Sequence, residues 1–302
     1  MTKYDIAFLT ESRYIDPNPT DPYKMAVLEE DKLLSRELDE RGLSSIRVDW
    51  ADSSFDWSSV RFGMFRSTWD YFYRYDEFQS WLSRMEGSMA FINTLPQVRW
   101  NMDKHYLLDL ESKGLSIVPT TYVEAGEKTT LEQVYKMSSA EKIIIKPAIS
   151  GTARHTYLIH QENLVRHEHV FQDLIQNECM LVQPFIENIA KKGEVSFVAF
   201  EGKFSHAVLK KAREGDFRVQ SDFGGTIHTY NASREEVKFV EKTIAACDTV
   251  PTYARVDIAI DDKDEMVLVE LELIEPDMWL RTNPGSAEKL IEAVTRHLQN
   301  SG

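Results

Sequence analysis

Cysteine is scarce in this chain of 302 residues, which contains only Cys179 and Cys247. Two cysteines are too few for a disulfide framework, and neither lies in a C-x-x-C pair or in a metal-ligand spacing. A chain of this length can bury a substantial core without covalent links. The sequence therefore predicts a protein of a reducing compartment that is stabilised by its core.

Long apolar runs and an excess of positive charge are also missing. No stretch approaches the roughly 18 apolar residues that a membrane helix needs, and the first residues lack the apolar segment of a secretory signal. The formal net charge of −14 argues against a nucleic-acid binder that relies on phosphate attraction. We expect a soluble, cytoplasmic protein that has neither a membrane nor a nucleic acid as its partner.

The first hundred residues alternate strand and helix patterns. Short apolar strands are predicted at Tyr4–Leu9, Ile46–Trp50 and Phe62–Arg66. Between the first two, apolar residues recur at helical spacing from Met25 to Leu38, and Gly42 supplies a helix stop. This alternation predicts an α/β layer.

A helix is predicted next, at the first domain junction. We expect Asn101 to cap it, Leu107, Leu108 and Leu110 to face inward, and Gly114 to end it.

The rest of the chain favours antiparallel sheet with covering helices. Glu201-Gly202 and the acidic turn 261–264 each separate two apolar runs, as in hairpins. Ser233 and Glu236 form a capping-box pattern before a helical stretch, and another amphipathic stretch occupies 287–298. Strands are predicted at Ile143–Lys146, Met180–Gln183, Val195–Phe200, Lys203–Leu209, Tyr253–Ile260 and Met266–Leu273.

Acidic residues interrupt two of these apolar strands. Residues two apart share a strand face, so Glu270 and Glu272 point the same way, and a hairpin would bring Asp257 and Arg255 opposite them. Three carboxylates beside an arginine suit a magnesium ion that bridges nucleotide phosphates. The alternative is an exposed sheet face on which acids simply alternate outward.

A small-residue loop follows another buried strand. Lys146 comes after three isoleucines, where an unpaired ammonium would be costly and an anionic ligand would remove the cost. In the loop after it, the backbone N–H groups of Ser150, Gly151 and Thr152 could approach phosphate oxygens. The alternative is an ordinary hairpin turn.

Together these segments resemble the ATP-grasp superfamily, in its glutathione-synthetase-like and ribosomal-protein-glutamate-ligase-like branch. The similarity spans roughly residues 100–290 and includes Lys104 in Asn-Met-Asp-Lys-His-Tyr and Lys146 in Ile-Ile-Ile-Lys-Pro. It implies that ATP lies between two α+β lobes and that both lysines contact its phosphates. It further implies adenine contacts from Gln183, Pro184, Phe185 and Ile186, and a ribose contact from Glu194.

The same resemblance assigns the catalytic groups. Asp257, Glu270 and Glu272 match the family's metal ligands for Mg²⁺, with Mn²⁺ as a substitute, although the last position is usually asparagine. Arg255 resembles the arginine that steadies the transferred phosphoryl group. Lys210 and the segment 215–225, with Arg218 as the expected contact, resemble the loop that closes over the γ-phosphate and the acceptor.

A narrower similarity is to the ATP-grasp subgroup that contains the ligase closing the ring of D-cycloserine. Three phrases resemble it: 65–71, 204–210 and 270–276. It implies an amino-acid-like substrate. Because α/β folds place ligands at strand ends, Arg66, Ser67, Thr68 and Trp69 are candidate substrate contacts, the alternative being a surface loop with a packed Trp69.

We therefore expect an N-terminal α/β substrate domain (1–100) and two ATP-grasp lobes (101–185 and 186–302). The expected reaction activates a carboxylate or a ureido or carbonyl oxygen by phosphorylation, for attack by an amine within the same molecule or from another. The alternatives are a small-molecule kinase on the same fold and a non-catalytic nucleotide sensor. The sequence leaves room for a homodimer.

Overall fold

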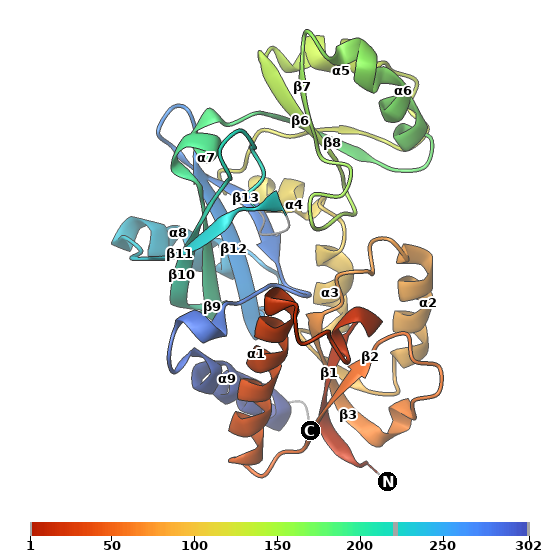
Figure 1. Ribbon diagram of the computed structural model, residues 1–302, viewed down its shortest axis with the longest axis vertical. Coiled ribbons are helices and arrows are strands. Elements are labelled where there is room, and N and C mark those ends of the chain that lie inside the picture. The colour runs from red at the N-terminus through yellow and green to blue at the C-terminus, as the bar shows by residue number, and fades with distance from the viewer. Residues whose placement is uncertain (1, 220–222, 301–302) are drawn as a thin grey trace.

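The computed structural model describes residues 2–219 and 223–300 (Figure 1). Its N-terminal unit is a parallel sheet of order β2-β1-β3-β4, so the expected α/β layer is confirmed. Successive side chains of β1 point to opposite faces, with Ile6 and Phe8 toward α1, and Ala7 and Leu9 toward α2. The elements are β1 (Tyr4–Thr10), α1 (Pro22–Asp39), β2 (Ser45–Asp49), β3 (Val60–Ser67), α2 (Tyr75–Met85) and β4 (Ala90–Ile92), with short 3₁₀ turns η1 (Ser12–Tyr14) and η2 (Trp57–Ser59).

The helix predicted after Asn101 is α4 (Tyr106–Ser112), and a separate short helix, α3 (Leu95–Asn101), precedes it. Asn101 is not the N-cap. It ends α3, and its side chain bonds the carbonyl of Leu271 and the amide of Leu273. The inward orientation predicted for Leu108 is also wrong, because its side chain is exposed.

The middle unit is an antiparallel sheet of order β5-β8-β6-β7. Helices α5 and α6 pack on one face of it, through side chains such as Val134 and Phe171, and lie at the top of Figure 1. The opposite face of this sheet is turned toward the rest of the molecule. The elements are β5 (Thr121–Val123), α5 (Leu131–Ser138), β6 (Lys142–Pro147), β7 (Tyr157–His160), α6 (Leu164–Ile175) and β8 (Met180–Pro184).

The third unit is an antiparallel sheet of order β11-β10-β9-β12-β13, and both predicted hairpins are present. The capping box of Ser233 and Glu236 starts α8. Helices α4 and α8 cover one sheet face through Leu107, Leu110 and Ile244, which leaves the opposite face for the acids. The elements are α7 (Glu187–Lys192), β9 (Glu194–Phe200), β10 (Lys203–Lys211), β11 (Thr226–Tyr230), α8 (Arg234–Ala245), β12 (Tyr253–Ile260) and β13 (Met266–Glu272).

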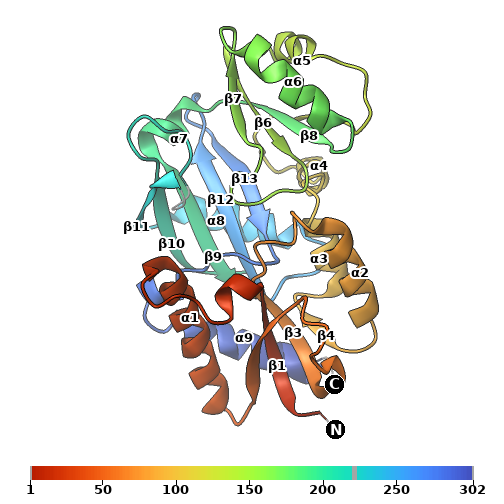
Figure 2. The same ribbon diagram turned by 45° about the vertical axis from the view of Figure 1, so that its right-hand side comes forward.

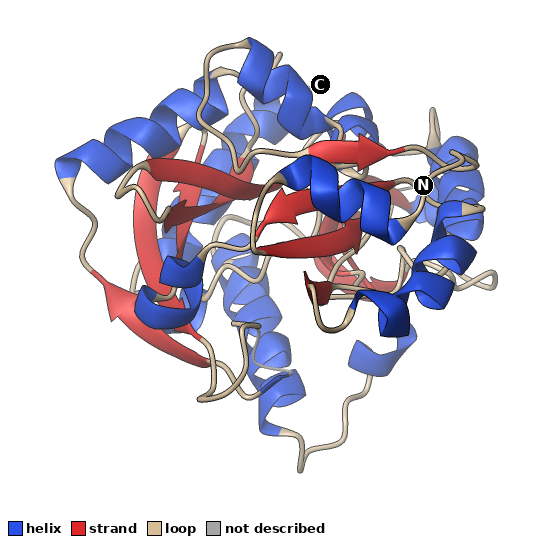
Figure 3. Cartoon of the chain, turned by 90° about the horizontal axis from the view of Figure 1, so that it is seen from above, coloured by secondary structure: helices blue, strands red, loops and turns tan. Residues whose placement is uncertain are grey.

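The chain then returns to the N-terminal unit. After a 3₁₀ turn, η4 (Leu280–Thr282), helix α9 (Ser286–Asn300) packs beside α1 (Figure 2). Seen from above, helices lie around the strands (Figure 3). The division into domains 1–100, 101–185 and 186–302 stays a proposal. Each range holds one sheet, while α4 packs on the third sheet and α9 on the first unit.

Candidate active site

A cavity of about 480 Å³ lies where the three units meet. Its wall brings together the catalytic, nucleotide and metal candidates from segments that are far apart in the sequence. These residues are Lys104, Lys146, Ser150, Gly151, Thr152, Gln183, Pro184, Phe185, Ile186, Glu194, Lys210, Arg218, Arg255, Asp257, Glu270 and Glu272.

The acidic trio lies on the open face of the β12–β13 hairpin. Asp257 pairs in register with Glu270, and Arg255 pairs with Glu272. Carboxylate oxygens of the three acids lie within 4.8 Å of one another. Asp257 is buried and the two glutamates are only partly accessible, so the alternative of a wet outer face is wrong. Hard oxygen donors at this spacing fit a magnesium ion.

Asp257 is surrounded by donors. The guanidinium of Arg255 bonds both of its oxygens at 2.9 Å, Lys210 Nζ lies 2.9 Å away, and Ser196 Oγ donates at 2.6 Å. Burial opposes the charge of this carboxylate, but the two cations outweigh burial and lower its pKa. Asp257 therefore stays ionised in the cavity.

Glu272 differs from its neighbours. Its carboxylate pairs with Arg255, yet burial, reinforced by the charges of Glu270 and Asp257, raises its pKa to about 7. Like charges held this close disfavour full ionisation. A divalent cation bound among the three acids would remove this repulsion, which supports the magnesium assignment on chemical grounds.

Two lysines enter the cavity beside the acids. Lys104 Nζ lies 3.0 Å from Glu270 Oε1 and donates to the carbonyl of Ser150 at 2.5 Å. The ammonium of Lys146 has no ion-pair partner in the part of the chain that the structure describes, and burial lowers its pKa. The charges of Glu270, Glu194 and Asp257 oppose this shift, and an anionic ligand for Lys146 stays a prediction.

A further buried pair joins Lys210 to Glu194 across neighbouring strands. Burial raises the pKa of Glu194 despite this lysine. Glu194 also lines the cavity, so a contact with ribose hydroxyls stays a prediction.

The loop after Lys146 joins β6 to β7 as a hairpin and also lines the cavity, and the approach of its N–H groups to phosphate stays a prediction. Thr152 has a positive φ of 51°. A side chain at Gly151 would place Cβ 2.5 Å from a ring carbon of Phe72. Glycine is therefore required where the loop passes close to the N-terminal unit.

Arg218 reaches the cavity from the segment predicted to close over the nucleotide. It pairs with Asp216 at 2.8 Å and lies over the ring of Phe223 at 3.7 Å. Residues 220–222 of this segment lie outside the described residues. Closure over the γ-phosphate stays a prediction.

The four substrate candidates lie at the end of β3 and just after it, and they have different surroundings. Trp69 lines the cavity, and its Nε1 donates to the carbonyl of Glu275. Arg66 is buried in an ion pair with Asp31, and Ser67 bonds Thr10. The structure thus gives Arg66, Ser67 and Thr68 no place on the cavity wall, because they face the interior of the N-terminal unit.

Sequence reasoning missed an aromatic wall supplied by the N-terminal unit. The rings of Tyr14 and Tyr23 lie 5.1 and 6.0 Å from that of Trp69. Arg13 and Glu275 also face the cavity. No motif in the sequence distinguished Arg13, Tyr14 or Tyr23.

This fold and cavity define an ATP-grasp enzyme, in which two lobes and an N-terminal unit enclose cations beside an acidic trio. A family model for the RimK-like ATP-grasp domain matches residues 103–294, and one for the N-terminal domain of D-cycloserine synthetase DcsG matches residues 6–93. The chain belongs to the RimK-like ATP-grasp family, and it is an ATP-binding ligase.

Relatives agree with this placement. The chain is 26% identical over 277 residues to the cycloserine biosynthesis protein DcsG of Streptomyces lavendulae, covering 85% of this chain and 90% of the relative. The crystal structure of D-cycloserine synthetase DcsG matches with a TM-score of 0.83 at 24% identity, over 97% of this chain and 99% of that one. The ATP complex of D-alanine–D-alanine ligase from Bacillus anthracis matches with a TM-score of 0.68 at 14% identity, over 99% and 100%.

No helix within residues 2–219 and 223–300 combines the length and the apolar character needed to cross a bilayer.

Proposed function

We propose that this ligase uses ATP to phosphorylate the carboxylate, or a ureido or carbonyl oxygen, of a small amino-acid-like substrate, which an amine then attacks. The observation that supports this most is the meeting of Lys104, Lys146 and Arg255 with the acidic trio in one cavity. The chemistry needs positioned cations rather than a protein nucleophile.

The nucleotide would lie between the two lobes. Lys104 and Lys146 would hold its phosphates, and the Gln183–Ile186 segment would hold the base. Lys146 supports this placement most directly, because its partly buried ammonium lines the cavity and has no ion pair within the described residues.

Asp257, Glu270 and Glu272 would hold the magnesium ion. When bound, the ion neutralises phosphate charge and orients the γ-phosphate. Manganese has the same preference for oxygen ligands and is expected to substitute.

Arg255 would stabilise the reacting phosphoryl group. Its guanidinium is already fixed by Asp257 and Glu272, so it needs no reorganisation when charge develops nearby. A substrate oxygen attacks the γ-phosphorus, and ADP leaves. The amine then attacks the activated carbon, loses a proton, and expels phosphate together with that oxygen.

The substrate would sit against the aromatic wall of Tyr14, Tyr23 and Trp69, at the N-terminal end of the cavity. The DcsG relatives match the N-terminal unit as well as the lobes, which supports an amino-acid-like substrate and, by similarity, an intramolecular ring closure. A homodimer and a cytoplasmic location remain predictions.

A screen tests the proposal. The protein is incubated with ATP, Mg²⁺ and pools of amino acids and their derivatives, while ADP release and product mass are followed. The proposal expects amine-dependent phosphate release together with a product that has lost the elements of water or of a leaving group. A stable phosphorylated compound would instead identify a kinase, and absence of ADP release with every pool would favour a nucleotide sensor.

A further inference from the structure

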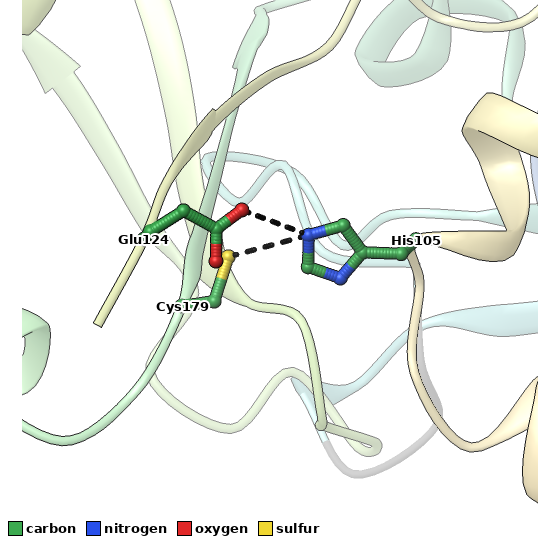
Figure 4. A group of neighbouring side chains, drawn as sticks. All are labelled: His105, Glu124 and Cys179. Carbon is green, nitrogen blue, oxygen red and sulfur yellow. Dashed lines mark hydrogen bonds and ion pairs between the residues drawn. The ribbon is translucent and has the colours of Figure 1, made fainter.

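A second group of metal-ligating side chains lies outside the cavity. His105 Nε2 is 3.1 Å from Glu124 Oε1 and 3.8 Å from Cys179 Sγ (Figure 4). One ligand atom from each of the three residues lies within 4.8 Å of the other two. None of the three lines the active-site cavity.

The three residues come from separate segments. His105 immediately precedes α4, Glu124 follows β5, and Cys179 precedes β8. The β5 and β8 strands pair antiparallel, with Val123 opposite Met180, so the residues just beyond this pair lie at the same end of the ladder. The grouping is therefore set by the fold rather than by sequence proximity.

These distances suit a tetrahedral ion. With zinc bonds of about 2.1 Å to nitrogen and about 2.3 Å to sulfur, tetrahedral angles separate the two ligand atoms by about 3.6 Å. A carboxylate oxygen would lie about 3.4 Å from the nitrogen on the same basis. The observed 3.8 Å from nitrogen to sulfur and 3.1 Å from nitrogen to oxygen lie within a few tenths of an ångström of these values.

The imidazole is also held as metal-bound histidines usually are. His105 Nδ1 lies 2.6 Å from Asp103 Oδ1, which leaves Nε2 to face Glu124 and Cys179. A carboxylate on the far nitrogen fixes the ring and raises its strength as a ligand. The ring also stacks on Tyr122 with centroids 4.3 Å apart, which limits its rotation.

Local charge favours a cation at this place. Burial, and then the negative charges of Glu124, Asp103 and Glu127, raise the pKa of the Cys179 thiol, so a thiolate here needs a bound cation to offset them. Side chains of His105 and Glu124 remain partly accessible, so an ion can enter. The donor set of imidazole, thiolate and carboxylate differs from the oxygen-only set of the active site, and it favours zinc over magnesium.

We propose that His105, Glu124 and Cys179 form a zinc(II)-type transition-metal site with a fourth position left to water. The site would connect the start of α4, which packs on the third sheet, to the middle sheet. Lys104 directly precedes His105, so a bound ion would also restrain this active-site lysine. The proposal does not depend on the ligase substrate.

Metal binding is measured on the metal-free full-length chain. Zinc titration by calorimetry is done in excess Mg²⁺, which occupies the carboxylate site. Cobalt(II) is titrated separately, because a bound thiolate gives cobalt a near-ultraviolet charge-transfer band that oxygen ligands do not. The variants are Cys179→Ser, His105→Gln and Asp103→Asn. The matched control is Cys247→Ser, which removes the other, buried cysteine.

The proposal predicts one zinc ion per chain, a cobalt–thiolate band, and a zinc-dependent rise in Tm. The band should be absent in Cys179→Ser and intact in Cys247→Ser. His105→Gln should abolish tight zinc binding, and Asp103→Asn should weaken it by roughly 10–100-fold. Equal zinc affinity in wild type and Cys179→Ser, or cobalt binding without a thiolate band, would overturn the proposal and leave a plain histidine–glutamate hydrogen bond.

Discussion

The ammonium of Lys104 lies 3.0 Å from the carboxylate of Glu270, although the two residues come from different units of the fold. The pair joins the segment before α4 to the last strand of the third sheet. It places one cation and one acid of the active site at a fixed separation. The candidate phosphate-binding and metal-binding groups meet at this junction.

Lys104→Met should lower the rate of ADP formation by roughly 10²–10³-fold, the usual cost of removing one preorganised charge from a reacting site. The change also leaves Glu270 without its nearest cation. Steady-state ADP release at saturating ATP measures the effect. Lys136→Met, which removes a surface lysine paired within α5, is the control and should keep wild-type turnover. Similar rates for the two variants would contradict the assignment of Lys104.

Glu272→Ala should abolish ADP formation while the circular dichroism spectrum is unchanged, because it removes a metal ligand and a partner of Arg255. Glu272→Asn restores an uncharged oxygen donor at this position. We expect it to regain magnesium-dependent turnover at a higher Mg²⁺ requirement. Glu265→Ala, in the exposed β12–β13 turn, is the control. Full activity of Glu272→Ala would rule out the metal assignment.

Trp69→Ala should raise KM for the small substrate by about tenfold, a loss of about 1.4 kcal/mol. The KM for ATP should change little, because the aromatic wall belongs to the N-terminal end of the cavity. Trp69→Phe keeps an aromatic ring but loses the bond to the Glu275 carbonyl, and should have an intermediate effect. A parallel rise in both KM values would show that Trp69 supports the fold of the cavity rather than binding the small substrate.

Asn93→Ala should lower the free energy of unfolding by about 2–4 kcal/mol, since buried partners lose their hydrogen bonds. The Asn93 amide donates to the carbonyls of Tyr253 and Leu273 and accepts from the amide of Thr252. It thereby ties the N-terminal sheet to the third sheet. Urea unfolding measures the change, and Asn231→Ala at an exposed position should be nearly neutral. Equal stabilities would show that these bonds do not hold the units together.

Stability should depend on pH through Glu30. Burial, helped by the charge of Asp277, raises its pKa from 4.5 to about 7, although Arg66 and Arg281 oppose the shift. The folded state then binds more protons than the unfolded state between these values, so the free energy of unfolding falls as the pH rises through this window. Urea midpoints between about pH 5 and about pH 8 report this slope. Glu30→Gln should reduce the slope and leave the share that the raised pKa of Glu272 contributes, and an unchanged slope would exclude Glu30 as a source.

The sequence predicted both hairpins, the acidic face and the strands that carry them, because alternating apolar residues and short turns fix these features locally, whereas β4, β7 and β11 were missed. The register that sets Asp257 opposite Glu270 follows from the hairpin, so the grouping of the acidic trio could be anticipated. The nucleotide residues came from family resemblance, and the cavity gathers all of them.

Features that depend on long-range packing could not be anticipated. Asn101 looked like a helix cap because asparagine favours that place, yet its amide is used to bond the third sheet. Arg66 looked like a ligand contact at a strand end, but Asp31 on α1 neutralises it inside the N-terminal unit. The aromatic wall and the His105 group form only when distant segments meet.

Transfer of the substrate oxygen to the released phosphate is the most direct test of the proposed chemistry. Once the screen has found a substrate, its reacting oxygen is labelled with ¹⁸O, and the mass of the released phosphate is measured by mass spectrometry. The account predicts that each phosphate contains one labelled oxygen, because that oxygen attacks the γ-phosphorus and leaves with it. Product formation with unlabelled phosphate would contradict activation of the substrate by phosphorylation.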